Sequence, residues 1–236
     1  MAFATTYTAP TLSESAPDIR AQFIRRTYTH LAGALLAFAA LEAVLLQLPI
    51  SYRFAEMVLS SGFAWLALLG GVMLVGVIAR GFAARAESKT LQYAGLGLYV
   101  VGQAIIFVPI LLLAQIQAGD NSLIYQAAAI TGTLFVGLTG VVFITRTDFS
   151  FMRSILMVGG FVALGIIACG LLFGFSMGTW FSGAMILLAA GFILYDTSNV
   201  LHHYHPEQYV GASLELFASI TLLLWYVLRL VMSSDD

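Results

Sequence analysis

Seven apolar runs in this chain are each long enough to cross a lipid bilayer as a helix. A spanning α-helix needs about 20 apolar residues, because the hydrocarbon core is about 30 Å thick and a helix rises about 1.5 Å per residue. The runs cover residues 30–48, 63–81, 91–116, 123–145, 154–174, 179–201 and 211–232. Alternation with a period of two residues is absent from them, which excludes a transmembrane barrel. We therefore expect an all-α, polytopic membrane protein with seven transmembrane helices.

The composition agrees with lipid as the solvent of this chain. Only 9% of its 236 residues are charged and 60% are hydrophobic, whereas soluble domains carry about 25% charged residues. The expected partner is therefore the lipid bilayer, and the lack of a basic stripe speaks against nucleic acid. The single cysteine, Cys169, lies in an apolar run and is expected to be a small buried hydrophobe.

Residues 1–22 differ from the rest, because they are polar and rich in Thr, Ser and Ala. They lack the apolar core of a signal peptide, so we expect a flexible cytoplasmic tail. Residues 23–236 then form one transmembrane domain, since the short connections between the runs leave no room for a soluble domain.

The distribution of positive charge predicts the orientation. Eight of the ten Lys and Arg residues fall on the side of the N-terminus, and only Arg53 and Arg229 fall on the other. Because cytoplasmic loops carry the excess of Lys and Arg, the N-terminus is expected in the cytoplasm and the C-terminus on the periplasmic or extracellular side. A bacterial inner membrane is the simplest location, since the tail carries no organelle address.

A few ionisable residues interrupt the apolar runs. Asp196 lies in the sixth run, where a carboxylate costs about 2.5–3.5 kcal/mol on insertion scales and so marks a functional site by default. Glu215 opens the seventh run and Arg80 ends the second, so the orientation places all three groups in the cytoplasmic half. Glu42 lies in the outer half of the first run. It lines a pathway, or it snorkels to the interface or pairs inside the bundle.

Two carboxylates that share a dry site cannot both stay ionised cheaply, so the pair can share a proton. An arginine beside them would instead hold one carboxylate charged. Such oxygens also suit Ca²⁺, which makes Asp196 a candidate calcium ligand. The structural alternative is that Asp196 binds polar backbone near a helix end, and that Glu215 stabilises the first turn of its helix through the helix dipole.

The loop after the sixth run contains His202, His203 and His205, and three imidazoles could hold a transition metal. The loop therefore suggests one possible function, that of an enzyme or a metal transporter. No nucleophile elbow, zinc-protease motif or phosphate-binding loop is present. A two-aspartate intramembrane protease would need a second aspartate within a span, and Asp196 is the only one. We therefore expect no enzymatic activity and no cofactor other than Ca²⁺ as a bound or passing ion.

The segment LYDTSNV, residues 194–200, resembles the [L/I]-Y-D-T-x-x-[I/V] motif in the sixth helix of the Bax inhibitor-1 (TMBIM) family, and the chain resembles a bacterial member of it. Residues 214–229 resemble the last helix of that family, and RRTYTHLAGALLAF, residues 25–38, resembles the first. The resemblance covers nearly the whole chain after about residue 22. It implies a bundle in which the seventh transmembrane helix is central and the other six surround it.

The resemblance also implies a function. In calcium-leak members of the family, two aspartates on helices six and seven form a pH-sensing pair that gates a slow cation leak. The first corresponds to Asp196 and the second to Ser219, which cannot hold that charge. Glu215 lies four residues before Ser219, on the same helix face, so we expect an Asp196–Glu215 or Asp196–Arg80 interaction instead, with Arg80 as the latch.

Two functions follow from the resemblance. The first is a pH-sensitive, slow Ca²⁺ leak channel gated by the carboxylate site. Some bacterial relatives also carry a serine at the second position, and those are associated with regulation of the membrane-bound ATP-dependent protease FtsH. The alternative is therefore a non-conducting regulator that binds a protease of that type.

Overall fold

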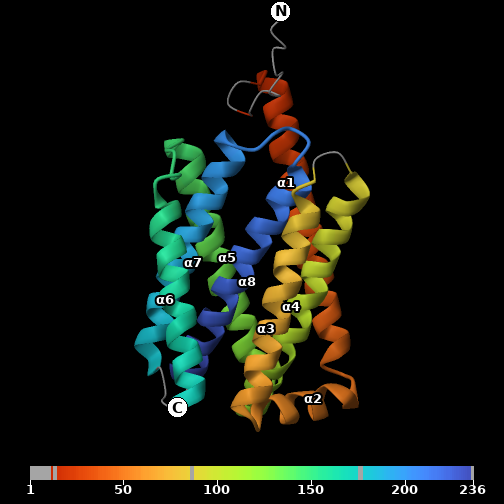
Figure 1. Ribbon diagram of the computed structural model, residues 1–236, viewed down its shortest axis with the longest axis vertical. Coiled ribbons are helices and arrows are strands. Elements are labelled where there is room, and N and C mark those ends of the chain that lie inside the picture. Colours follow the sequence, from red (N-terminus) through yellow and green to blue (C-terminus); the bar gives the residue numbers. More distant parts are fainter. Residues whose placement is uncertain (1–11, 13–14, 86–87, 175–177, 235–236) are drawn as a thin grey trace, which may run out of the picture.

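The chain folds into a bundle of long helices with one short helix across an end (Figure 1). The computed structural model describes residues 12, 15–85, 88–174 and 178–234. The helices are α1 (Pro17–Leu45), α2 (Pro49–Leu59), α3 (Gly62–Ala83), α4 (Lys89–Ala118), α5 (Ser122–Thr145), α6 (Met152–Phe173), α7 (Gly178–His202) and α8 (Tyr209–Ser234). All except α2 are long and apolar enough to span a membrane. The protein is therefore an all-α, multi-pass membrane protein with seven spans, as expected.

The helix bounds follow the apolar runs closely from α3 to α8, but α1 differs. It begins at Pro17, well before the apolar run at residue 30, and so includes residues 17–22, which the sequence analysis assigned to the tail. Proline is favoured in the first turn of a helix, and Asp18 complements the helix dipole there. Hydropathy identifies only the apolar part of a helix. It therefore could not show that α1 continues through the polar residues before the apolar run.

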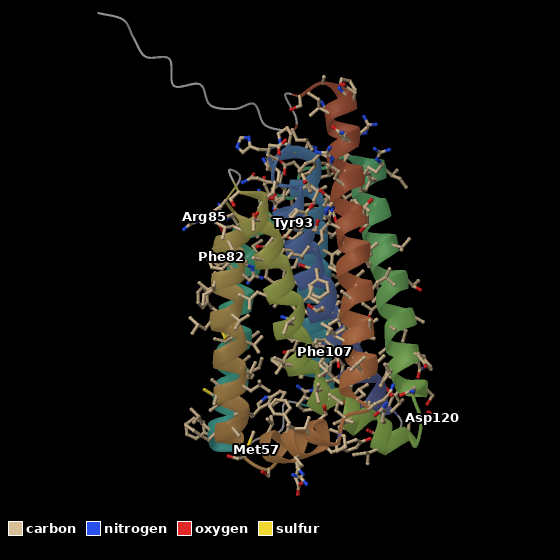
Figure 2. All side chains as sticks on the ribbon, turned by 90° about the vertical axis from the view of Figure 1, so that its right-hand side faces the viewer. Met57, Phe82, Arg85, Tyr93, Phe107 and Asp120 are labelled. Carbon is tan, nitrogen blue, oxygen red and sulfur yellow. The ribbon has the colours of Figure 1, made fainter. Side chains whose placement is uncertain are left out.

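The short helix α2 was not predicted, because Pro49 was interpreted only as a break. Proline is also favoured at the start of a helix, and α2 begins there. It buries Ser51, Ala55 and Val58 on one face and packs against α3 and α4. Met57, at the lower end of the bundle (Figure 2), is exposed on its other side. An amphipathic helix that lies across the end of a bundle is typical of the membrane interface.

The helix α8 is the most extensively buried of the last four helices and runs diagonally through the bundle (Figure 1). It packs against α1, α3, α4, α5 and α7, whereas α6 packs chiefly on α7 and α3. The expected placement of the last helix with all six others around it is therefore not confirmed. Cys169 on α6 is exposed, so the expectation of a buried cysteine is wrong. Lipid accepts an apolar side chain as readily as a protein core does.

A close approach of α3 and α4 depends on one glycine of α4. A Cβ atom at Gly95 would lie 2.5 Å from the carbonyl oxygen of Ala79 and 2.9 Å from the amide nitrogen of Ala83. The Gly95→Ala variant must push the two helices apart, and such overpacking costs about 1–3 kcal/mol. We expect a lower Tm in detergent, measured against Gly97→Ala. A Cβ at Gly97 meets no atom within 4 Å, so this control should keep or raise the Tm. Equal Tm values would contradict the close contact.

Candidate functional site

The first part of the site is a buried hydrogen bond between α7 and α8. Asp196, on α7, is buried with 7% of its surface exposed. The hydroxyl of Ser219, on α8, donates a hydrogen bond to Asp196 Oδ2 at 2.5 Å. The two residues that the sequence analysis aligned with the family's aspartate pair therefore do meet. Because a hydroxyl donates where a second carboxylate would repel, Asp196 is the single acid of this contact.

The second part is an ion pair between α3 and α8. Arg80, in the last turn of α3, places its Nε atom 3.0 Å from Oε1 and 2.9 Å from Oε2 of Glu215. Its guanidinium carbon also lies 5.3 Å from the ring centre of Tyr99. The ion pair is partly accessible, with 44% of the Arg80 side chain and 32% of the Glu215 side chain exposed.

The pairing differs from the expectation of a direct Asp196–Glu215 or Asp196–Arg80 interaction. Glu215 lies one helical turn nearer the start of α8 than Ser219 does, and Arg80 ends α3 at the level of Glu215. Arg80 therefore forms its ion pair with Glu215. Asp196 lies further into the bundle and is hydrogen-bonded to Ser219. Glu215 and Ser219 are four residues apart on α8 and so lie on one face of that helix, which makes the hydrogen bond and the ion pair two adjacent layers of one site.

The connection from α7 to α8 lies over the same end of the bundle. Burial raises the pKa of Tyr204 well above its usual value, with a further contribution from the Glu215 and Asp196 charges, so its phenol stays neutral. The backbone carbonyl of Tyr204 accepts a hydrogen bond from the amide of Leu12 at 3.0 Å, and Leu12 is fully buried. Sequence reasoning missed Leu12, because an isolated leucine in a polar segment carries no signal.

Glu42 lies apart from this site, as the sequence predicted. It is buried with 5% of its surface exposed, and neither carboxylate oxygen has a hydrogen-bond partner within the described residues. In that part of the chain Glu42 therefore neither reaches the interface nor pairs with another side chain.

An aromatic cluster, defined here as Phe38, Tyr99, Phe107 and Phe217, lies between Glu42 and the ion pair. Phe38 is one turn before Glu42 on the same face of α1, and its ring centre lies 5.2 Å from that of Phe107 and 5.9 Å from that of Phe217. The ring centre of Phe217 lies 6.1 Å from that of Tyr99. The guanidinium of Arg80 lies over the Tyr99 ring. Figure 2 shows Phe107 between Tyr93, toward one end of the bundle, and Asp120, toward the other.

The histidine loop does not form a metal site. His202 Nδ1 lies 3.0 Å from the carbonyl oxygen of Ser198, whereas His203 Nε2 lies 3.1 Å from Asp148 Oδ2. Partial desolvation raises the pKa of Asp148, but hydrogen bonds from Ser150 and His203 outweigh it and lower this pKa to about 2. No group of three or more metal-binding side chains occurs among the described residues. The loop instead connects α7 to the α5–α6 turn.

Comparison with known proteins assigns the bundle to a family. The family model described as "Inhibitor of apoptosis-promoting Bax1" matches residues 20–236. The chain belongs to the Bax inhibitor-1 family. The resemblance seen in LYDTSNV and in the first and last spans is thereby confirmed. The match covers residues 20–236, so Glu42, Arg80, Asp196, Glu215 and Ser219 all lie inside the matched region.

Two of the similar proteins match nearly the whole chain, and a third matches about half of it. Bax inhibitor 1 of Schizosaccharomyces pombe is 26% identical over 241 residues, covering 95% of this chain and 82% of that protein. The Golgi anti-apoptotic protein of vaccinia virus (strain Lister) is 25% identical over 233 residues, covering 95% and 90%. An uncharacterized membrane protein of Vibrio cholerae is 28% identical over 116 residues, covering 48% and 52%.

Proposed function

We propose that this member of the family is a pH-sensitive channel for a slow cation leak, with Ca²⁺ as the permeant ion and Asp196 as the gating carboxylate. The observation that carries the proposal is the buried Asp196–Ser219 hydrogen bond beside the Arg80–Glu215 ion pair. An ionisable group inside a membrane bundle is costly and is usually retained for ion or proton passage. Protonation would remove the only charge of this contact.

Each charged residue has a distinct part in the proposal. The Arg80–Glu215 ion pair is the latch, because it joins α3 to α8 directly above Asp196. Glu42, beyond the aromatic cluster, offers a second carboxylate along the route. Calcium takes 6–8 oxygen ligands, and the described residues contain no cluster of three or more acidic, His or Cys side chains. Calcium is accordingly proposed as a passing ion and not as a resident one.

The proposed location is the inner membrane of a bacterium, with the basic end of the bundle in the cytoplasm. We use "basic end" for the end at which α1 begins, where eight of the ten Lys and Arg residues gather. The excess of Lys and Arg in cytoplasmic loops supports this orientation, and seven spans then place the end of α8 on the opposite side.

The second candidate function is a non-conducting regulator of a membrane-bound, ATP-dependent protease of the FtsH type. The presence of Ser219 where calcium-leak members carry an aspartate favours it, because this site holds one buried acid and not two. A regulator requires a protein-binding segment, and the N-terminal residues are the part of the chain proposed to supply it.

The test is Ca²⁺ flux into proteoliposomes that contain a fluorescent indicator, measured between about pH 6 and pH 8, because burial raises the pKa of a carboxylic acid above its value in water. Wild-type flux should vary with pH. The Asp196→Asn variant keeps the shape and an oxygen acceptor for Ser219 but cannot ionise, so its flux should be independent of pH and equal to the wild-type flux at the acidic limit. Asp120→Asn is the matched control, because this carboxylate lies in the α4–α5 turn, far from the site (Figure 2).

Two outcomes would contradict the channel. One is flux no greater than that of empty vesicles, with the protein shown to be folded and inserted. The other is an unchanged pH profile in Asp196→Asn. The first outcome would favour the regulator, which predicts copurification with the protease and loss of that association when residues 1–11 are deleted.

A further inference from the structure

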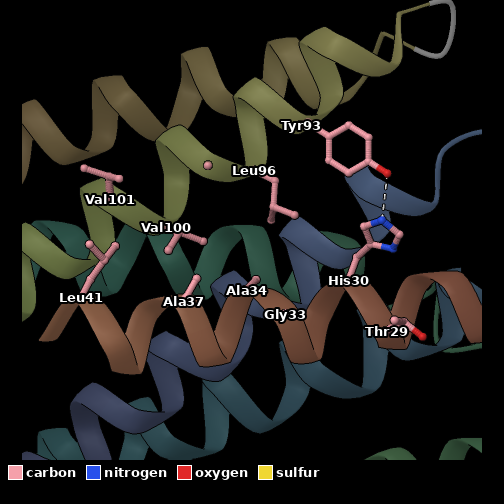
Figure 3. Close-up of a pocket in the computed structure, with 11 residues that line it drawn as sticks. Thr29, His30, Gly33, Ala34, Ala37, Leu41, Tyr93, Leu96, Val100 and Val101 are labelled. Atoms are coloured by element: carbon pink, nitrogen blue, oxygen red, sulfur yellow. Dashed lines mark hydrogen bonds between the residues drawn. The ribbon is translucent and has the colours of Figure 1, made fainter. Parts of the chain in front are cut away.

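A groove runs along the outside of the bundle between α1 and α4 (Figure 3). Its volume is about 550 Å³. Gly33 and Ala37 line it from α1, and Gly97 and Val101 line it from α4. All four residues are exposed, so the groove opens toward the surroundings of the bundle. In a multi-pass membrane protein those surroundings are lipid.

The groove exists because small residues face each other across it. A Cβ atom at Gly33 or Gly97 would meet no atom within 4 Å, so neither helix fills the space. Along α1 the lining extends from Thr29 to Leu41, about 18 Å at 1.5 Å per residue. This is slightly more than half of the hydrocarbon thickness of about 30 Å. The groove therefore matches the depth of one leaflet.

Polar and aromatic side chains close the groove at the basic end. His30 Nε2 and the hydroxyl of Tyr93 form a hydrogen bond of 2.9 Å, drawn as a dashed line in Figure 3. The ring of His30 also lies 5.1 Å from that of Tyr209. The cationic groups of Arg26 and Lys89 lie 5.4 Å and 4.3 Å from the Tyr209 ring centre. Tyrosines with Lys and Arg are typical of the headgroup level of a membrane.

Among the described residues, the charge of this rim favours an anion. Lys89 is paired with Glu207 at 2.6 Å, whereas no carboxylate within the described residues forms an ion pair with Arg26. Arg26 is exposed, and the His30–Tyr93 hydrogen bond lies on the next turn of the same face of α1. Both ring nitrogens of His30 are already engaged, Nδ1 with the Arg26 carbonyl at 2.7 Å and Nε2 with Tyr93. A phosphate at this position would therefore meet the Arg26 guanidinium, which has no carboxylate partner among the described residues, beside the phenol of Tyr93.

We propose that the groove binds one anionic phospholipid from the leaflet at the basic end. One acyl chain lies between Gly33 and Ala37 of α1 and Gly97 of α4, and the phosphate is held by Arg26 beside the Tyr93 phenol, which His30 positions. The apolar walls select a lipid and not a soluble phosphate ester, and the cationic rim selects an anionic headgroup over a zwitterionic one. The proposal does not depend on whether the bundle conducts ions.

The test is native mass spectrometry of the full chain in a neutral detergent, titrated with phosphatidylglycerol or with phosphatidylcholine. Wild type should retain one phosphatidylglycerol in preference to phosphatidylcholine. The Gly97→Leu and Gly33→Leu variants fill the groove and should weaken binding of both lipids by at least about tenfold, because buried methylene groups supply the affinity. The Arg26→Gln variant should lose about fivefold for phosphatidylglycerol alone, since one basic residue is removed from the headgroup level.

The control is Gly165→Leu on α6, where an added Cβ also meets no atom within 4 Å. It should bind both lipids as wild type does and have the same Tm as the groove variants, which shows that those variants are folded. Equal retention of the two lipids by wild type, or unchanged binding in both groove variants, would overturn the proposal. Competition by glycerol 3-phosphate at the concentration of the lipid would also overturn it, because the site would then recognise a free phosphate ester.

Discussion

Replacing Phe217 with alanine is expected to raise the Ca²⁺ flux and lower the stability of the bundle at the same time. The side chain is fully buried, and its ring contacts Phe38 and Tyr99. Phe→Ala substitutions in cores cost about 3–5 kcal/mol, because the surroundings only partly fill the cavity. Here the cavity would open between the Arg80–Glu215 ion pair and Glu42. Flux through proteoliposomes and the Tm in detergent measure the two effects.

Two variants separate the effects of Phe217→Ala. Phe217→Leu keeps most of the volume, so its flux should stay near that of wild type and its stability loss should be below about 1.5 kcal/mol. Phe161→Ala removes a ring from the exposed surface of α6, where 72% of the side chain is accessible, and should change neither quantity. A Phe217→Ala variant with a lower Tm but an unchanged flux would place the ion route elsewhere in the bundle.

The seven spans could be predicted from sequence because insertion into lipid depends on the length and hydropathy of a segment, which are local properties. The same reasoning explains the two errors at the membrane surface. The first turns of α1 and the whole of α2 are less apolar than the spans, so hydropathy does not mark them as helices. There the proline at each helix start was the relevant signal, and a proline marks a beginning as well as a break.

Asp196, Glu215 and Arg80 could be singled out from sequence as candidate site residues, since they are charged groups in or at the ends of apolar runs. Their pairing could not be predicted. Sequence resolves depth only to about one helical turn, or 5.4 Å, and that interval separates Glu215 from Ser219. Which of them faces Arg80 depends on the rotation and tilt of α3 against α8. These are set by packing, for example by the close contact at Gly95, and not by the residues of the site.

The groove between α1 and α4 was invisible in the sequence for a different reason. Glycine and alanine serve equally to bring helices together and to leave space on a lipid-facing surface. At Gly95 a Cβ would collide with the backbone of α3, whereas at Gly97 it would meet open space. Two glycines that are two residues apart on one helix therefore have opposite roles, and only the neighbouring helix distinguishes them.

Replacing Ser219 with aspartate is expected to make the stability of the bundle strongly dependent on pH. The serine hydroxyl lies 2.5 Å from Asp196 Oδ2, so the new carboxylate would face the old one inside the bundle. Two like charges about 4 Å apart repel by about 4 kcal/mol at an effective dielectric constant of 20. At low pH the two acids can share a proton and the repulsion is absent. As the pH rises and the shared proton is lost, the folded state alone bears the repulsion.

The Tm of Ser219→Asp should therefore fall as the pH is raised from about 6 to about 8, by on the order of 10 °C for a chain of this size. The wild-type Tm should change much less over the same range. Ser219→Asn, which is similar in size and neutral, should follow wild type. The double variant Asp196→Asn/Ser219→Asp has one carboxylate again, so it should lose the steep dependence. If the double variant keeps it, the effect arises from the aspartate alone and not from its repulsion by Asp196, and the assignment of a shared site on α7 and α8 is wrong.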